Sequence, residues 1–112
     1  MNRGETNRNI INRETEVSQL RVTAVNAVVR WAQTGKNELT MRSTVNRYME
    51  VSGANLSIAG EEGILGKRRI EAQLILRDCI TPLSMENLRK AETILFRIAE
   101  DDAPTMKRGL GR

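Results

Sequence analysis

Apolar side chains recur at three- and four-residue steps between Glu14 and Thr34. One stripe of this helical pattern consists of Val17, Leu20, Ala24, Val28 and Trp31. A second stripe, about 140° away by the helical period, consists of Val22, Val25, Val29 and Ala32. The pattern predicts a long helix that is apolar over more than half of its circumference. Such a helix is typical of the centre of a fold or of a subunit contact.

A second helix is predicted from Glu38 to Ser52, with Asn37 as its N-cap and Gly53 at its end. The next stretch, Ala54 to Gly66, ends with three glycines in seven residues, which argue against a stable long helix. This stretch fits either a short helix at Leu56 to Glu61 or a hairpin.

A third helix is predicted after Gly66 and ends near Cys79. Thr81-Pro82 then breaks the chain, because proline disfavours the helical conformation in the residue before it. Ser84 is expected to cap a fourth helix. Three consecutive acids stand at the carboxyl end of that helix, where the helix dipole disfavours negative charge, so we expect this end to fray. The predicted fold class is mostly α, a single domain of about four helices.

Composition adds a cationic bias at both ends of the 112-residue chain. Eighteen Lys and Arg oppose fourteen Asp and Glu, and fourteen of the eighteen are Arg, which presents a planar fork to phosphate. Residues 1–13 hold three Arg and one Glu, and the last eight residues hold three cations and no acid. We therefore predict a flexible basic arm at 1–12, a helical domain at 13–103 and a basic tail at 104–112. This distribution favours a polyanionic partner.

Several classes of chemistry are disfavoured by what the composition lacks. There is no histidine and only one cysteine, Cys79, so imidazole catalysis, a cysteine-rich zinc site and an internal disulfide are excluded. The segment from Gly60 to Lys67 does not fit a phosphate-binding loop, because Arg68 stands where Ser or Thr is needed. We expect no enzymatic activity, no cofactor and no metal. The absence of an amino-terminal apolar run and of a long apolar stretch predicts a cytoplasmic, non-membrane protein.

The run from Leu56 to Leu74 resembles a helix-turn-helix motif. Three residues stand where such motifs need a small residue, a turn glycine and an apolar residue: Ala59, Gly63 and Ile64. The resemblance implies that Lys67, Arg68 and Arg69 begin a recognition helix that meets the major groove. Glu62 and Ile70 depart from the pattern. The alternative is a glycine-rich connector before an ordinary amphipathic helix.

A second resemblance starts from Leu20 to Ala24, which alternates apolar and polar residues like a strand. As a strand, this stretch would make the chain similar to a ribbon-helix-helix protein, with Arg21 and Thr23 reading bases. The helical period across Glu14 to Thr34 fits better. Trp31 and Tyr48 are interpreted as core or interface residues, because single-strand binders interleave several aromatics with basic residues.

Together these patterns predict a sequence-specific double-stranded DNA-binding protein, a small transcriptional regulator. It is expected to form a homodimer through the Glu14 to Thr34 helix. Arg42 and Arg47 on the second helix are expected to position the DNA backbone. The competing hypothesis is a helical adaptor or chaperone that binds a partner protein and has no nucleic-acid role.

Overall fold

The computed structural model describes residues 2–53 and 60–102, with side chains described over 14–52 and 63–102. Four helices make up these ranges: α1 (Asn2–Thr34), α2 (Glu38–Gly53), α3 (Gly60–Cys79) and α4 (Met85–Asp101). The described ranges contain no strand, which confirms the prediction of an all-helical fold with four helices. None of the helices in these ranges is long and apolar enough to cross a membrane.

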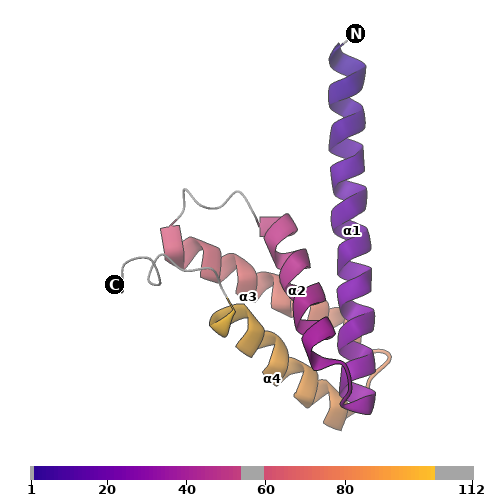
Figure 1. Cartoon of the computed structure of the whole chain (residues 1–112), viewed down its shortest axis with the longest axis vertical. Coiled ribbons are helices and arrows are strands. Elements are labelled where there is room, and N and C mark those ends of the chain that lie inside the picture. Colours follow the sequence, from indigo (N-terminus) through magenta and orange to yellow (C-terminus); the bar gives the residue numbers. More distant parts are fainter. Residues whose placement is uncertain (1, 54–59, 103–112) are drawn as a thin grey trace.

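The helices form two antiparallel pairs that pack on each other (Figure 1). α2 returns alongside α1, and α4 returns alongside α3. α1 contacts all three other helices through its carboxyl-terminal half, while its amino-terminal part projects beyond them (Figure 1). With 33 residues at 1.5 Å rise per residue, α1 is about 50 Å long.

The core explains why α1 is apolar over so much of its surface. Its first stripe supplies Ala24 and Val28, both fully buried, and Val25 and Val29 of the second stripe pack against the same cluster. The other helices, with Leu83 of the turn between α3 and α4, complete the core: Met41, Val45, Tyr48, Met49, Ala72, Ile75, Cys79, Ala91, Ile94, Leu95, Ile98 and Ala99. α1 is therefore the central helix of the fold. Val22, at 59% exposed, is its one large apolar side chain left open to solvent in the described part.

The boundaries of α1 differ from the prediction at one end and agree at the other. The helix begins at Asn2, so the backbone predicted to be an arm at 1–12 is helical from residue 2. At the other end, Gly35 takes a left-handed φ of 72° and donates its N–H to the Trp31 carbonyl at 2.6 Å, as expected of a terminal glycine. Leu20 to Ala24 lies inside α1, so the ribbon-helix-helix alternative is wrong.

α3 begins earlier than the sequence suggests. Gly60, Gly63 and Gly66 all lie within one continuous helix, so the turn that the helix-turn-helix resemblance places at Gly63 is not there. Glycine in a helix costs roughly 1 kcal/mol but does not forbid it, and the packing of the rest of α3 outweighs that cost. The first residues of the proposed motif, 56–59, lie outside the described residues.

α4 follows its predicted start closely. Ser84 is the N-cap, and its Oγ accepts a hydrogen bond from the Asn87 backbone N–H at 3.2 Å. The break at Thr81-Pro82 is a turn, as expected. Ala91, Ile94, Leu95, Ile98 and Ala99 form the buried side of α4.

Candidate nucleic-acid interface

Arg68, predicted to contact DNA, is buried inside the molecule. Only 3% of the residue is exposed. Its Nε donates to the Ala99 carbonyl at 2.9 Å, and its Nη2 donates to the Ile98 carbonyl at 2.9 Å and to Asn46 Oδ1 at 2.6 Å. Burial lowers the pKa of this guanidinium, while the charges of Asp102 and Glu50 raise it. Arg68 therefore does not lie on an exposed surface, and its donors are used by the carboxyl end of α4 and by Asn46.

Lys67 holds a second buried polar group. Its Nζ lies 2.5 Å from Glu71 Oε2, and the Glu71 side chain is only 3% exposed. The Tyr48 hydroxyl donates a hydrogen bond to Glu71 Oε1. Burial, followed by this hydrogen bond, raises the pKa of Tyr48 to about 12, although the nearby Arg21 lowers it. Lys67 therefore compensates an internal carboxylate, which reduces its availability to a duplex.

The remaining predicted residues are scattered over the surface. Arg69 pairs with Glu100 of α4 at 3.3 Å, and Arg21 lies 3.7 Å from Asp78 of α3. Arg47 is exposed on α2 and forms no ion pair with any described residue. Arg42 lies elsewhere on α2, 25% exposed. The structure does not bring the six predicted residues together on one surface.

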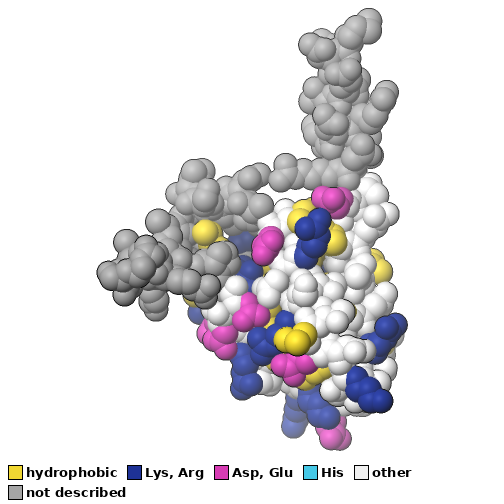
Figure 2. All heavy atoms as spheres, viewed as in Figure 1, with side chains coloured by type: hydrophobic (Ala, Val, Ile, Leu, Met, Phe, Trp, Pro, Cys, Tyr) yellow, Lys and Arg dark blue, Asp and Glu magenta, His cyan; other side chains and the backbone are white. Residues whose placement is uncertain are grey.

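A different cationic surface lies where α4 meets the ends of α1 and α2. It is an open groove of about 420 Å³ lined by Trp31, Glu38, Arg42, Arg89, Lys90, Thr93, Ile94 and Arg97. Four of these side chains are cationic and one is acidic, which gives a formal charge of +3. Lys and Arg side chains gather over this part of the molecule in Figure 2, at the lower end of the face shown. We call this surface the cationic groove.

Three cations of the cationic groove carry uncompensated charge. Arg89, Lys90 and Arg97 are exposed and form no ion pair with any described residue. The acids nearest to them on the same helix are not among the lining residues: Glu86, Glu92, Glu100 and Asp101. The wall formed by α4 is therefore positive along its length.

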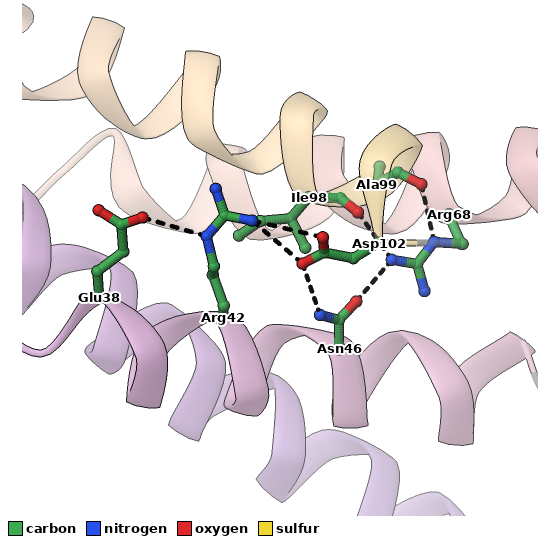
Figure 3. A network of polar contacts seen from close by, with 7 residues as sticks. All are labelled: Glu38, Arg42, Asn46, Arg68, Ile98, Ala99 and Asp102. Atoms are coloured by element: carbon green, nitrogen blue, oxygen red, sulfur yellow. Dashed lines mark hydrogen bonds and ion pairs between the residues drawn. The ribbon is translucent and has the colours of Figure 1, made fainter. Parts of the chain in front are cut away.

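Arg42 forms the opposite wall and is held by two carboxylates (Figure 3). Its Nε donates to Glu38 Oε2 at 3.2 Å, and its Nη1 lies 3.4 and 3.3 Å from the two carboxylate oxygens of Asp102. Asn46 Nδ2 also donates to Asp102, at 3.1 Å, and Asn46 Oδ1 accepts from Arg68. One chain of hydrogen bonds thus runs from the cationic groove to the buried Arg68.

Trp31 supplies the aromatic surface of the cationic groove. It packs partly against the core, as predicted, and also lines the groove. The residue is partly exposed, and its indole Nε1 forms no hydrogen bond with any described residue. Trp31 is the one tryptophan of the chain, so its fluorescence reports on the occupancy of this surface.

The spacing of polar residues in the fourth helix is a sequence signal for this site that the pattern of apolar positions does not reveal. Arg89, Thr93 and Arg97 are spaced by four residues and so share one side of α4, opposite the apolar side that predicted the helix. The contribution of Arg42 and Trp31 depends on the packing of α1 and α2, which spacing within one helix does not reveal.

Other chemistry is not supported in the part of the chain with described side chains. No group of three or more Cys, Asp or Glu residues there could hold a metal ion. Cys79 is fully buried, and burial raises the pKa of its thiol to about 11, which keeps it in the unreactive thiol form.

Comparison of the chain with protein-family models, with curated proteins and with solved structures found no match.

Proposed function

We propose that the protein binds double-stranded DNA by contacting its phosphate backbone in the cationic groove. The supporting observation is the row of exposed, unpaired cations on α4, Arg89, Lys90 and Arg97, facing Arg42 across the groove. The partner is the one predicted from the sequence, and Arg42 of α2 remains a contact, but the main contact is on α4 and not at Lys67, Arg68 and Arg69 of α3.

The length of the row suits a phosphate backbone. Arg89 and Arg97 are eight residues apart on α4, which is about 12 Å at the helical rise. Each DNA strand carries one charge per 3.4 Å of axis, so a row laid along the duplex axis covers the rise of roughly three to four phosphates. Thr93 lies between the two arginines and adds a hydroxyl donor.

A duplex is favoured over a single strand. Only 3% of the residues are aromatic, and Trp31 is the one aromatic side chain of the cationic groove. Proteins that bind single strands stack successive bases on several aromatic rings. A matched single-stranded competitor that displaces the duplex at lower concentration would contradict this assignment.

Sequence preference and dimerisation are further parts of the proposal. Phosphate contacts position a duplex but do not read its sequence, so the cationic groove alone supports general affinity. Selection of bound fragments from random duplex tests for the sequence preference that a transcriptional regulator needs.

A homodimer would use the exposed Val22 side of α1. Comparison of the sedimentation of the wild-type protein with that of Val22→Glu tests for this dimer.

The experiment compares two triple variants of equal charge by fluorescence anisotropy with a labelled duplex. The groove variant is Arg89→Gln, Lys90→Gln and Arg97→Gln. The control variant removes three exposed cations outside the cationic groove: Arg30, Lys36 and Arg77, each to Gln. We expect the groove variant to lose affinity by roughly 500-fold at about 0.1 M salt, since each neutralised phosphate counts for about 0.9 of a power of ten there and three are lost. The control variant is expected to lose far less. Equal losses would contradict the proposal.

The helical adaptor is the competing function, and the projecting end of α1 favours it (Figure 1). A helix that extends beyond its own domain offers a surface on which a partner helix can pack. Wild-type protein that fails to bind duplex at low salt would favour the adaptor over DNA binding.

A further inference from the structure

Arg42 belongs to two sets of contacts at once. It lines the cationic groove with Arg89, Lys90 and Arg97, and it also pairs with Glu38 and Asp102. Its two ion pairs use Nε and Nη1, and Nη2 makes no hydrogen bond with the described residues. In Figure 3 no dashed line meets this third guanidinium nitrogen, and 25% of the Arg42 side chain is exposed. A ligand in the groove can therefore approach Arg42 while the ion pairs are still formed.

The ion pairs remove the positive charge of Arg42 from the groove. One guanidinium facing two carboxylates gives this trio a formal charge of −1. The three other cations have no such partners, so Arg42 is the one cation of the cationic groove whose charge is already compensated by described residues. A phosphate that gains Arg42 must compete with Asp102 and Glu38 for it.

Because of the surrounding contacts, such an exchange costs the fold little stability. The Arg42–Asp102 pair is partly exposed, with 25% and 27% of the two side chains accessible, so water weakens it. When Arg42 leaves, Asp102 keeps the hydrogen bond from Asn46 Nδ2 at 3.1 Å. Its backbone N–H also stays bonded to the Ile98 carbonyl at 3.1 Å. No buried carboxylate is left without a donor.

We propose that Asp102 is an internal competitor of DNA, and that binding of a duplex transfers Arg42 from Asp102 to a phosphate. This inference rests on the proposed function, because it concerns the regulation of the same groove. The Arg42–Asp102 pair lowers the affinity of the resting protein, and any event that neutralises Asp102 raises it. The side chain of Asp102 thereby sets how many phosphates the groove neutralises, three or four.

A double-mutant cycle tests this competition. Duplex affinity is measured for the wild-type protein, Asp102→Asn, Arg42→Gln and the double variant. Asn keeps an oxygen that can accept from Asn46, so the local fold is retained. Asp101→Asn is the matched control, because Asp101 is the adjacent acid, is exposed and takes no part in the network. Urea unfolding of each variant establishes that it is folded.

We expect Asp102→Asn to raise duplex affinity about fivefold more than Asp101→Asn does, a coupling at the low end of those between linked sites. In the Arg42→Gln background the two substitutions should have equal effects. Glu38→Gln, which releases the other side of Arg42, is expected to raise affinity in the same Arg42-dependent way and serves if Asp102→Asn unfolds.

Two results would overturn the inference while leaving the proposed function intact. One is a gain from Asp102→Asn that persists in the Arg42→Gln background, which would reduce Asp102 to a general negative charge. The other is a loss of affinity, which would make Asp102 a group that positions Arg42 for phosphate. A wild-type protein that does not bind duplex at all would overturn the proposed function, and this inference with it.

Discussion

Gly35 ends α1 in a conformation that other residues adopt at a cost. Its φ of 72° lies in the left-handed region, although no atom stands within 4 Å of the position that a Cβ would take. We expect Gly35→Ala to lower the free energy of unfolding by roughly 1–2 kcal/mol, since the penalty comes from the backbone alone. Urea unfolding at constant slope measures the difference.

Gly66 is the matched control for that substitution. It lies inside α3, and the space that an added Cβ would occupy is likewise open to a distance of 4 Å. Gly66→Ala should raise the free energy of unfolding by roughly 0.5–1 kcal/mol, because alanine is the better helix former. The two Gly→Ala substitutions are thus predicted to change the free energy of unfolding in opposite directions. A change in the same direction would contradict the assigned backbone conformations.

Tyr48 is the single tyrosine of the chain, so its ionisation can be observed directly. Burial and the hydrogen bond to Glu71 raise its pKa to about 12. We expect the absorbance of tyrosinate to develop with a midpoint well above 10 in the folded protein and to return to about 10 in urea. A midpoint near 10 under native conditions would show that Tyr48 is not held against Glu71.

The raised pKa of Tyr48 also makes the folded protein lose stability as the pH becomes alkaline. The folded chain holds the Tyr48 proton more tightly than the unfolded chain does, so the contribution is complete below pH 10. It is lost as pH rises from 10 to about 12, by an amount on the order of 2–3 kcal/mol. Tyr48→Phe should remove this part of the alkaline loss, which comparison of unfolding at pH 8 and pH 11 measures.

At the scale of the elements, Arg68 of α3 links this helix to the carboxyl end of α4. Its buried guanidinium donates to the carbonyl of Ala99 in the last turn of α4, and to the carbonyl of Ile98, which also accepts the Asp102 backbone N–H. These bonds also place a positive charge at the carboxyl end of α4, where the dipole favours it. The acids that predicted fraying at this end are therefore offset by a cation from another helix.

Removal of Arg68 should cost far more than removal of its neighbour. Arg68→Met removes the donor to the Ala99 carbonyl and to Asn46 Oδ1, and one of the two donors to the Ile98 carbonyl, so we expect a loss of about 2–4 kcal/mol in the free energy of unfolding. Arg69→Met breaks only an ion pair whose partners are 48% and 50% exposed, and should cost less than about 1 kcal/mol. Similar losses for the two variants would contradict the buried placement of Arg68.

The sequence predicts the elements well where local signals decide them. The apolar period of α1, the terminal Gly35 and the capping Ser84 each specify a boundary or a face that the structure retains. The glycines from Gly60 to Gly66 misled the prediction, because packing of the rest of the helix outweighs their low propensity. Local propensity predicts a helix least well where tertiary contacts stabilise it.

The three adjacent cations of α3 do not form one exposed cluster, for a reason that lies outside the local sequence. Lys67, Arg68 and Arg69 look like one exposed basic cluster, but successive helical residues point in directions about 100° apart. Arg68 turns toward carbonyls some thirty residues further along the chain, whereas Arg69 remains at the surface. Which of three adjacent cations is buried depends on the helix packed above it, and that is set by the tertiary fold.

At the scale of the whole molecule, the charge relevant to function is collected from separate helices. Trp31 comes from α1, Arg42 from α2 and the unpaired cations from α4. Net charge predicted a polyanionic partner but not this surface, because the four cations span more than fifty residues of sequence. The fold brings them together and leaves three of them without an acidic partner among the described residues.

The salt dependence of duplex affinity tests the central claim most directly. Each phosphate neutralised adds about 0.9 to the magnitude of the slope of log affinity against log salt. Taking the difference between the wild-type protein and the variant with Arg89, Lys90 and Arg97 each changed to Gln cancels contributions from cations elsewhere. We predict that this difference is about 2.7, the value for three contacts. Identical slopes for the two folded proteins would show that the cationic groove does not hold the DNA backbone.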